Sequence, residues 1–98
     1  MSATSGISEG RIIKKIPGGK MLKVVVRVRE GRIIHARFHG DYFVYPEEVV
    51  EDMEREICGK TLDEAKDIIE KYLASVEMVG ISIQDFRDAL EEAYEKAR

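Results

Sequence analysis

Three stretches in the first half of the chain alternate apolar and polar residues, which is the pattern of half-buried β-strands. They cover residues 11–16, 21–29 and 32–39, and the second is the most regular. The residues predicted to face the core are Leu22, Val24, Val26 and Val28 of the second strand and Ile34, Ala36 and Phe38 of the third. The residues predicted to face outward on the third strand are Ile33, His35, Arg37 and His39.

Short glycine-containing segments separate these strands. Pro17-Gly18-Gly19 ends the first strand, and its glycines permit a tight turn. Glu30-Gly31 is placed where a two-residue hairpin would join the second strand to the third. Gly40-Asp41 ends the third strand. The strands are therefore predicted to pair in chain order, as an antiparallel sheet.

The second half of the chain has helical periodicity. The first helix is expected to begin at Pro46 and to stop at Gly59, with Val49, Val50, Met53 and Ile57 as its apolar stripe. Thr61 to Glu64 reads as a capping box that opens a second helix. Ser82, with Asp85 three residues later, is expected to cap a third helix.

Strands followed by helices predict an α+β fold, with a sheet of about three antiparallel strands and the helices packed on one of its faces. The 98 residues suit one domain. Residues 1–10 are small and polar, so we expect a flexible N-terminal tail at 1–10 and the domain at 11–98.

Composition restricts the environment. No apolar run approaches the roughly 20 residues of a membrane span, and the first ten residues contain no apolar segment typical of a secretory signal. The single cysteine, Cys58, excludes an internal disulfide and any multi-cysteine metal site. We therefore expect a cytoplasmic protein without a membrane partner.

Charge is distributed unevenly along the chain. Residues 1–40 contain nine Lys or Arg and two acidic residues, whereas residues 41–98 contain seven and seventeen, which gives a net charge of −3 overall. A basic surface could bind nucleic acid, a nucleotide or an acidic protein, and solvated faces of a sheet and of helices explain the same pattern. The few aromatic residues among the basic ones argue against a base-stacking surface, and so against nucleic acid as the partner.

No constellation of catalytic residues stands out. His35 and His39 are about 13 Å apart along a strand, too far to share one ion, so we expect no metal site. Cys58 is expected to pack as a small hydrophobic residue at a helix C-terminus, where a thiol is not activated. Gly18-Gly19-Lys20 lacks the spacing and the hydroxyl residue of a P-loop, although its backbone and its ammonium group could still face an anion.

Tyr42, Phe43 and Tyr45 lie close together between the last strand and the first helix. They could belong to the core or could anchor a partner protein. From the residues alone, the chain is a small α+β binding or accessory domain.

Several motifs, in order, resemble the accessory domain of lipoate–protein ligases. They are Lys15-Ile16-Pro17-Gly18-Gly19-Lys20, Gly31-Arg32-Ile33, Gly40-Asp41-Tyr42-Phe43, Pro46-Glu47-Glu48, Glu54 and Gly59. The resemblance extends over residues 11–98. Tyr42 is a departure, because the family usually has Phe there, but the change keeps an aromatic ring.

The resemblance implies a free-standing accessory subunit, of the kind found in archaea, that is not catalytic alone. It would form a heterodimer with the catalytic subunit of the ligase. The complex would use ATP and Mg to activate lipoate to lipoyl-adenylate, and would then transfer the lipoyl group to a lysine of a lipoyl acceptor domain. No cofactor is expected on this chain itself. The implied fold is similar to that of iron–sulfur scaffold and sulfur-acceptor proteins.

Two segments are the expected contacts with the catalytic subunit, because both lie at strand ends. The residues are Pro17, Gly18, Gly19, Lys20, Gly40, Asp41, Tyr42, Phe43 and Pro46. An alternative on the same fold is a sulfur-acceptor or iron–sulfur scaffold protein that uses Cys58, which requires an exposed and reactive thiol. A third reading is a nucleic-acid module that uses the basic half of the chain.

Overall fold

The computed structural model describes residues 6–18 and 20–98 and measures 45 × 24 × 19 Å. In chain order the elements are β1 (Ile7–Ile16), β2 (Lys20–Arg29), β3 (Arg32–Gly40), β4 (Phe43–Tyr45), α1 (Glu48–Ile57), α2 (Leu62–Leu73), β5 (Glu77–Val79) and α3 (Ile83–Ala97). The predicted tail is wrong for residues 7–10, because β1 already begins at Ile7 and pairs there with Arg29. Residues 1–5 of that predicted tail lie outside the described residues.

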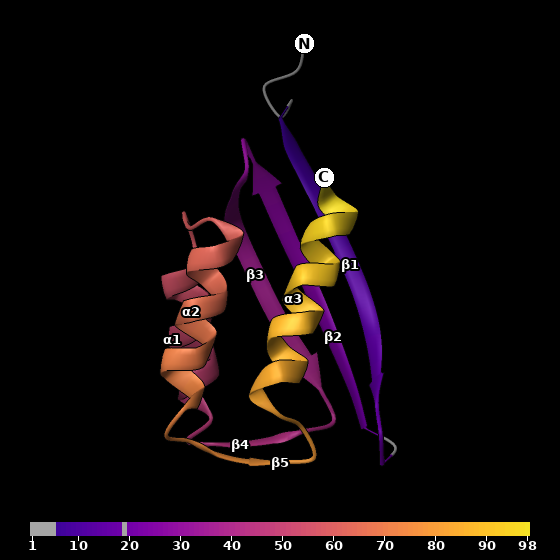
Figure 1. Cartoon of the computed structure of the whole chain (residues 1–98), viewed down its shortest axis with the longest axis vertical. Coiled ribbons are helices and arrows are strands. Elements are labelled where there is room, and N and C mark those ends of the chain that lie inside the picture. The colour runs from indigo at the N-terminus through magenta and orange to yellow at the C-terminus, as the bar shows by residue number, and fades with distance from the viewer. Residues whose placement is uncertain (1–5, 19) are drawn as a thin grey trace.

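The main sheet has the predicted antiparallel order β1-β2-β3 (Figure 1). Glu30 and Gly31 join β2 to β3 with φ angles of 52° and 80°. Two consecutive positive φ angles are the pattern of a type I′ turn, whose twist matches that of the flanking strands. The hairpin predicted at these two residues is confirmed.

One inward–outward assignment in β3 is wrong. The pairing passes from Arg27–His35 to Val28–Ile33, so Ile34 is an extra residue in β3, a β-bulge. The bulge inverts the alternation: Ile33 is fully buried, and Ile34, predicted to be inward, is 37% exposed. Ile33 also exchanges backbone hydrogen bonds with the α1–α2 loop, donating to the carbonyl oxygen of Lys60 and accepting from the Gly59 N–H.

The helices follow the predicted signals, with one shift. The capping boxes Thr61–Glu64 and Ser82–Asp85 are both formed, and Gly59 ends the α1 segment with a φ of 87°. Helix α1 starts at Glu48, so Pro46 is not its first residue as predicted. Pro46 instead follows a cis peptide bond at the end of β4.

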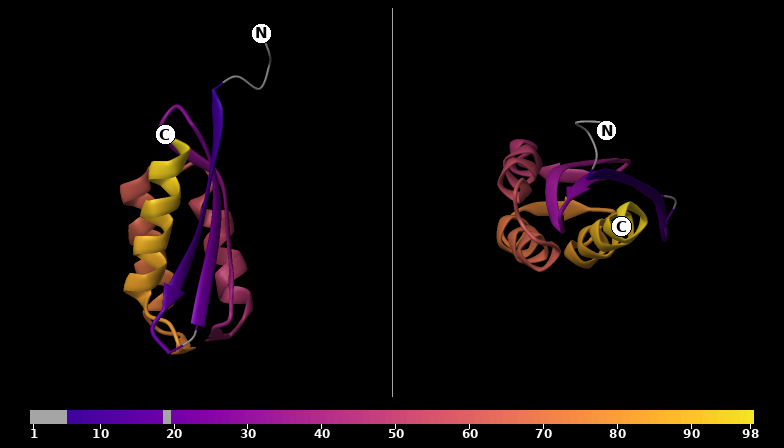
Figure 2. Two further views of the ribbon diagram at one scale, coloured as in Figure 1. Left: turned by 90° about the vertical axis from the view of Figure 1, so that its right-hand side faces the viewer. Right: turned by 90° about the horizontal axis from the view of Figure 1, so that it is seen from above.

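Helices α2 and α3 lie on one side of the sheet, with α3 across β1 and β2, whereas α1 flanks the edge strand β3 (Figure 2). The predicted α+β architecture is therefore confirmed. The closest approach is at Gly10, where an added Cβ would lie 2.0 Å from the carbonyl oxygen of Ala93. Glycine in β1 and alanines in α3 thus let two backbones come together. Next to Ala93, the Tyr94 hydroxyl donates to the carbonyl oxygen of Gly31 at 3.1 Å, so both contacts hold the C-terminal half of α3 to the sheet.

A second, two-stranded ribbon was not predicted. Strands β4 and β5 pair antiparallel, although more than thirty residues separate them in the chain. Val44 faces the core from this ribbon, and Phe43, Tyr45 and Val79 are exposed on it. The ribbon closes the end of the molecule at which β3 ends and α3 begins (Figure 1).

Candidate functional site

The structure brings the two predicted contact segments together at one end of the molecule. The Asp41 N–H donates to the carbonyl oxygen of Met21 at 3.0 Å. At Gly40, an added Cβ would lie 2.2 Å from that same oxygen and 2.8 Å from the Tyr42 ring. Glycine is therefore required at position 40, because no side chain fits there, whereas the donor at position 41 is a backbone group.

Lys20 connects the β1–β2 turn to the junction between β5 and α3. An added Cβ at Gly80 would lie 2.9 Å from Cε of Lys20 and 3.2 Å from its Cγ. The aliphatic part of Lys20 thus passes over Gly80, which leaves the ammonium group at this end of the fold. A side chain at position 80 would displace the lysine.

The three aromatic residues of the junction divide between core and surface. Tyr42 is half-buried, packs edge-on against Phe86 with 5.3 Å between ring centroids, and donates its hydroxyl hydrogen to the carbonyl oxygen of Phe38. Phe43 and Tyr45 are 50% and 59% exposed, and their rings are parallel at 6.4 Å. Tyr42 therefore belongs to the core, whereas Phe43 and Tyr45 lie on the surface.

We call this region the end surface. Its members are Pro17, Gly18, Lys20, Gly40, Asp41, Phe43, Tyr45, Val79 and Gly80. Val79, 58% exposed, pairs with Phe43 across the ribbon, and nothing in the sequence indicated it.

Three of the predicted contact residues are not part of the end surface. Tyr42 contributes mainly to the core, Pro46 is exposed at the far side of β4, and Gly19 lies outside the described residues. The end surface combines exposed apolar rings with backbone held rigidly by the Gly40 crossing, features typical of an anchor for a protein partner. Partner binding at these residues stays a prediction.

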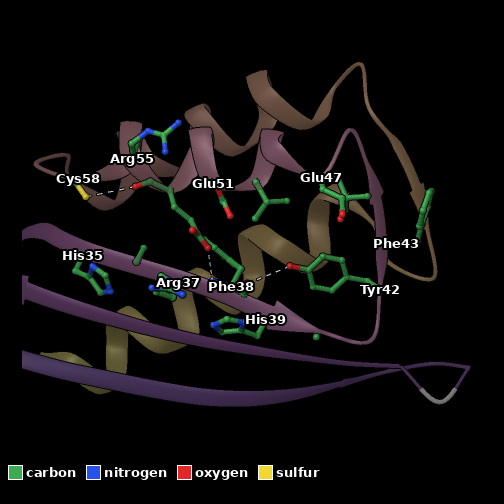
Figure 3. A pocket seen from close by; sticks show the side chains of 15 residues that line it. His35, Arg37, Phe38, His39, Tyr42, Phe43, Glu47, Glu51, Arg55 and Cys58 are labelled. Atoms are coloured by element: carbon green, nitrogen blue, oxygen red, sulfur yellow. Dashed lines mark hydrogen bonds between the residues drawn. The ribbon is translucent and has the colours of Figure 1, made fainter.

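A groove of about 730 Å³ runs between β3 and α1, next to the end surface (Figure 3). His35, Arg37 and His39 line the strand side, and Glu47, Glu51 and Arg55 line the helix side. In the part of the chain that the structure describes, no three His, Cys, Asp or Glu side chains are grouped so that they could hold a metal ion. The groove therefore offers polar contacts along an edge strand.

Glu54 links the two walls of this groove. Its carboxylate accepts a hydrogen bond from the Phe38 N–H at 2.8 Å, on the outer edge of β3 (Figure 3). Burial raises the pKa of Glu54, and the Phe38 N–H partly opposes that rise. Burial, together with the negative charge of Glu54, raises the pKa of Tyr42 to about 12. Tyr42 thus contributes to packing. Glu54 protects the edge of the sheet, because an N–H that is already bonded cannot pair with another strand.

The expectation that Cys58 packs as a buried residue is wrong. Helix α1 ends at Ile57, so its last buried residue precedes the cysteine, and Cys58 turns outward. Its thiol donates to the carbonyl oxygen of Glu54 at 3.6 Å. Exposure meets one requirement of the sulfur-acceptor alternative. The chain has one cysteine, however, and scaffold function normally needs several.

Comparison with known proteins supports the fold. The structure is similar to a chain from a structural analysis of an archaeal lipoylation system, described as a bi-partite lipoate protein ligase and its E2 lipoyl domain from Thermoplasma acidophilum. The TM-score is 0.71 at 24% sequence identity, and the match covers 86% of this chain and 93% of that chain. No protein-family model matches the sequence, and no curated protein matches it significantly.

No helix among residues 6–18 and 20–98 combines the length and the apolar character needed to cross a bilayer.

Substituting Glu54 tests the account of the groove. Because the pKa of Glu54 is raised in the folded protein, the unfolded chain releases this proton at a lower pH than the folded chain does. The contribution of Glu54 to the free energy of unfolding is therefore greatest below pH 4.5, and it is lost as the pH rises through the raised pKa. We expect Glu54→Gln to be at least as stable as the wild type at pH 7, with the difference vanishing near pH 4. Glu54→Ala leaves the Phe38 N–H without its partner and should cost about 1–2 kcal/mol.

Urea denaturation at several pH values measures both effects. Glu51→Gln, an exposed residue of the same helix, is the matched control for removing one charge. If Glu54→Gln destabilised the protein as much as Glu54→Ala at pH 7, the ionised carboxylate itself would be required.

Proposed function

We propose that the protein is the accessory subunit of a two-component lipoate–protein ligase. In this role it acts with a catalytic subunit in the ATP-dependent activation of lipoate to lipoyl-adenylate, before the lipoyl group passes to a lysine of an acceptor domain. The observation that carries the proposal is the fold match, which covers 93% of a chain from a bipartite ligase system. The sequence motifs that resemble the ligase accessory domain point to the same function, and two of their residues, Gly40 and Phe43, lie on the end surface.

The physical task of such a subunit is to reduce an ordering cost. Adenylation needs ATP and a carboxylate held in line while negative charge builds at phosphorus. A catalytic subunit with mobile substrate loops loses conformational freedom when it binds these substrates. A small rigid partner that docks beside the loops would order them before the substrates bind, and would so reduce the conformational freedom lost on substrate binding. In this proposal ATP, Mg and lipoate are held by the catalytic subunit.

The end surface is suited to this docking. Phe43 and Tyr45 provide exposed rings, and Lys20 provides a cation near the same edge. The backbone beneath them is fixed by the Gly40–Met21 approach and by the β4–β5 pairing. A preorganised surface of this kind binds with little further ordering of its own side.

Truncating the exposed rings tests the docking surface. We expect the double variant Phe43→Ala/Tyr45→Ala to bind the catalytic subunit at least tenfold more weakly in calorimetry, because buried aromatic anchors dominate such interfaces. Asp41→Ala should also weaken binding through its carboxylate, because its backbone bond to Met21 does not depend on the side chain.

Ile7→Ala is the matched control, since Ile7 is an exposed apolar residue at the opposite end of the sheet. Unchanged affinity in the ring variant, with normal folding by circular dichroism, would exclude the end surface as the contact.

Activation itself is measured by ATP–pyrophosphate exchange that depends on lipoate. We expect exchange to be slow with the catalytic subunit alone and to rise severalfold when this chain is added. A catalytic subunit that exchanges at full rate alone would contradict the proposal.

The exposure of Cys58 is the one observation that favours the sulfur-acceptor alternative. Cys58→Ser should therefore be tested in the same assay, and we expect it to support exchange as well as the wild type. Loss of exchange in that variant would contradict the expectation that the thiol has no part in lipoate activation.

A further inference from the structure

The sheet face opposite the helices is uncovered and strongly basic. We call it the outer sheet face. Its outward side chains are Glu9, Arg11, Ile13 and Lys15 on β1, Met21, Lys23, Val25, Arg27 and Arg29 on β2, and His35, Arg37 and His39 on β3. Helices α2 and α3 pack on the other side, and α1 borders this face along the β3 edge (Figure 2), so the β1 and β2 part of the face is left uncovered by the described chain.

Among the residues that the structure describes, the positive charge of this face is compensated in two places only, by Glu9 on β1 and, beside Arg37 and His39, by Glu54 of α1. Its one carboxylate, Glu9, is held between Arg11 and Arg27, at 2.7 and 3.2 Å, and the two hydrogen bonds lower the pKa of Glu9. Within the described residues, no carboxylate oxygen comes within 4 Å of the cationic nitrogens of Lys15, Lys23, Arg29 and Arg37. Other lysines of the protein, by contrast, are paired on the helical side, as Lys66 is with Glu91.

The cations surround an apolar strip. The register places Val25 between Arg11 and Arg37 in one row across the sheet. In the next row Ile13, 62% exposed, lies beside Lys23, and Met21 is exposed beyond it. An apolar centre with a charged rim is the composition of a protein-binding patch.

We infer that the outer sheet face is the docking surface for the acceptor domain, through carboxylates on that domain. The inference rests on the proposed function, in which the end surface is occupied by the catalytic subunit and a second folded protein must be presented to it. Electrostatic complementarity would steer this second protein to the complex and orient it.

The size of the face fits a substrate that must leave after transfer. Ten-residue strands extend about 33 Å, and three strands span roughly 10–15 Å, so the face offers on the order of 400 Å². Stable complexes bury about 800 Å² per partner. A contact of half that area is typical of transient encounters, which suits a domain released after modification.

Two other occupants are less consistent with the face. Nucleic acid would find cations without any outward aromatic side chain among the described residues of the sheet, and the acidic helical side would repel it. A second copy could bring its acidic helices to the sheet face, but that head-to-tail contact does not close and would propagate into filaments.

The test is an NMR titration of the isotope-labelled full chain with the unmodified lipoyl acceptor domain of the same organism. We expect shifts at the amides of Ile13, Lys23, Val25 and Arg37, and a weakening of binding of at least tenfold in 0.5 M NaCl. The charge-reversal variant Lys23→Glu/Arg37→Glu should weaken binding at least tenfold as well.

Lys96→Glu/Arg98→Glu, at the end of α3, is the matched control with the same change in charge, and its affinity should stay within twofold of the wild type. No shifts, or shifts confined to the helices or the end surface, would overturn the inference. So would shifts of these amides with a 20-base-pair DNA duplex but not with the acceptor domain, or shifts caused by raising the concentration of the chain alone.

A separate readout distinguishes this inference from the proposed function. ATP–pyrophosphate exchange in the presence of free lipoate needs no acceptor domain, so Lys23→Glu/Arg37→Glu should stimulate this exchange as well as the wild type does. If even the wild-type chain failed to stimulate exchange, the proposed function would fail, whereas the titration would still decide whether the acceptor domain binds the outer sheet face.

Discussion

The close approach of α3 to β1 is the contact on which the rest of the structure depends. Gly10 has no side chain, and this lets the backbone of α3 at Ala93 come against the strand. The helix then lies along β1 and β2, with its start at the end of the sheet where β4 and β5 pair. Tyr94 fixes the opposite end of the same helix to the Gly31 turn. A bulkier residue at position 10 would force the helix away from the sheet and open the core.

This packing decides which surfaces remain for partners. With α2 and α3 on one side of the sheet and α1 at the β3 edge, the fold keeps two exposed regions: the aromatic end surface and the basic outer sheet face. They differ in chemistry, since one presents stacked rings over rigid backbone and the other presents mostly unpaired cations around an apolar strip. The two proposals assign one surface to a stable companion and the other to a transient substrate.

The sequence predicted the elements whose pattern is long and regular. The alternation in β2 and the capping boxes at Thr61 and Ser82 depend on local residues, and all of them are confirmed. The features it missed depend on distant contacts: the bulge at Ile34 accompanies the bridge from Ile33 to Lys60, and the ribbon joins two three-residue strands. At the candidate site, the sequence identified Gly40 and Phe43 but not Val79, which reaches the end surface only through that ribbon. Cys58 was misjudged because the apolar stripe of α1 ends one residue before it.

Hydrogen–deuterium exchange on this chain, free and bound to a ligase catalytic subunit, tests the central claim most directly. If the chain is an accessory subunit that docks through its aromatic end, complex formation protects the amides of the β1–β2 turn and of residues 40–46 and 77–81, and leaves the outer edge of β3 and the helical face unchanged. Protection confined to the helices, or no protection under conditions in which the catalytic subunit adenylates lipoate, would contradict the account.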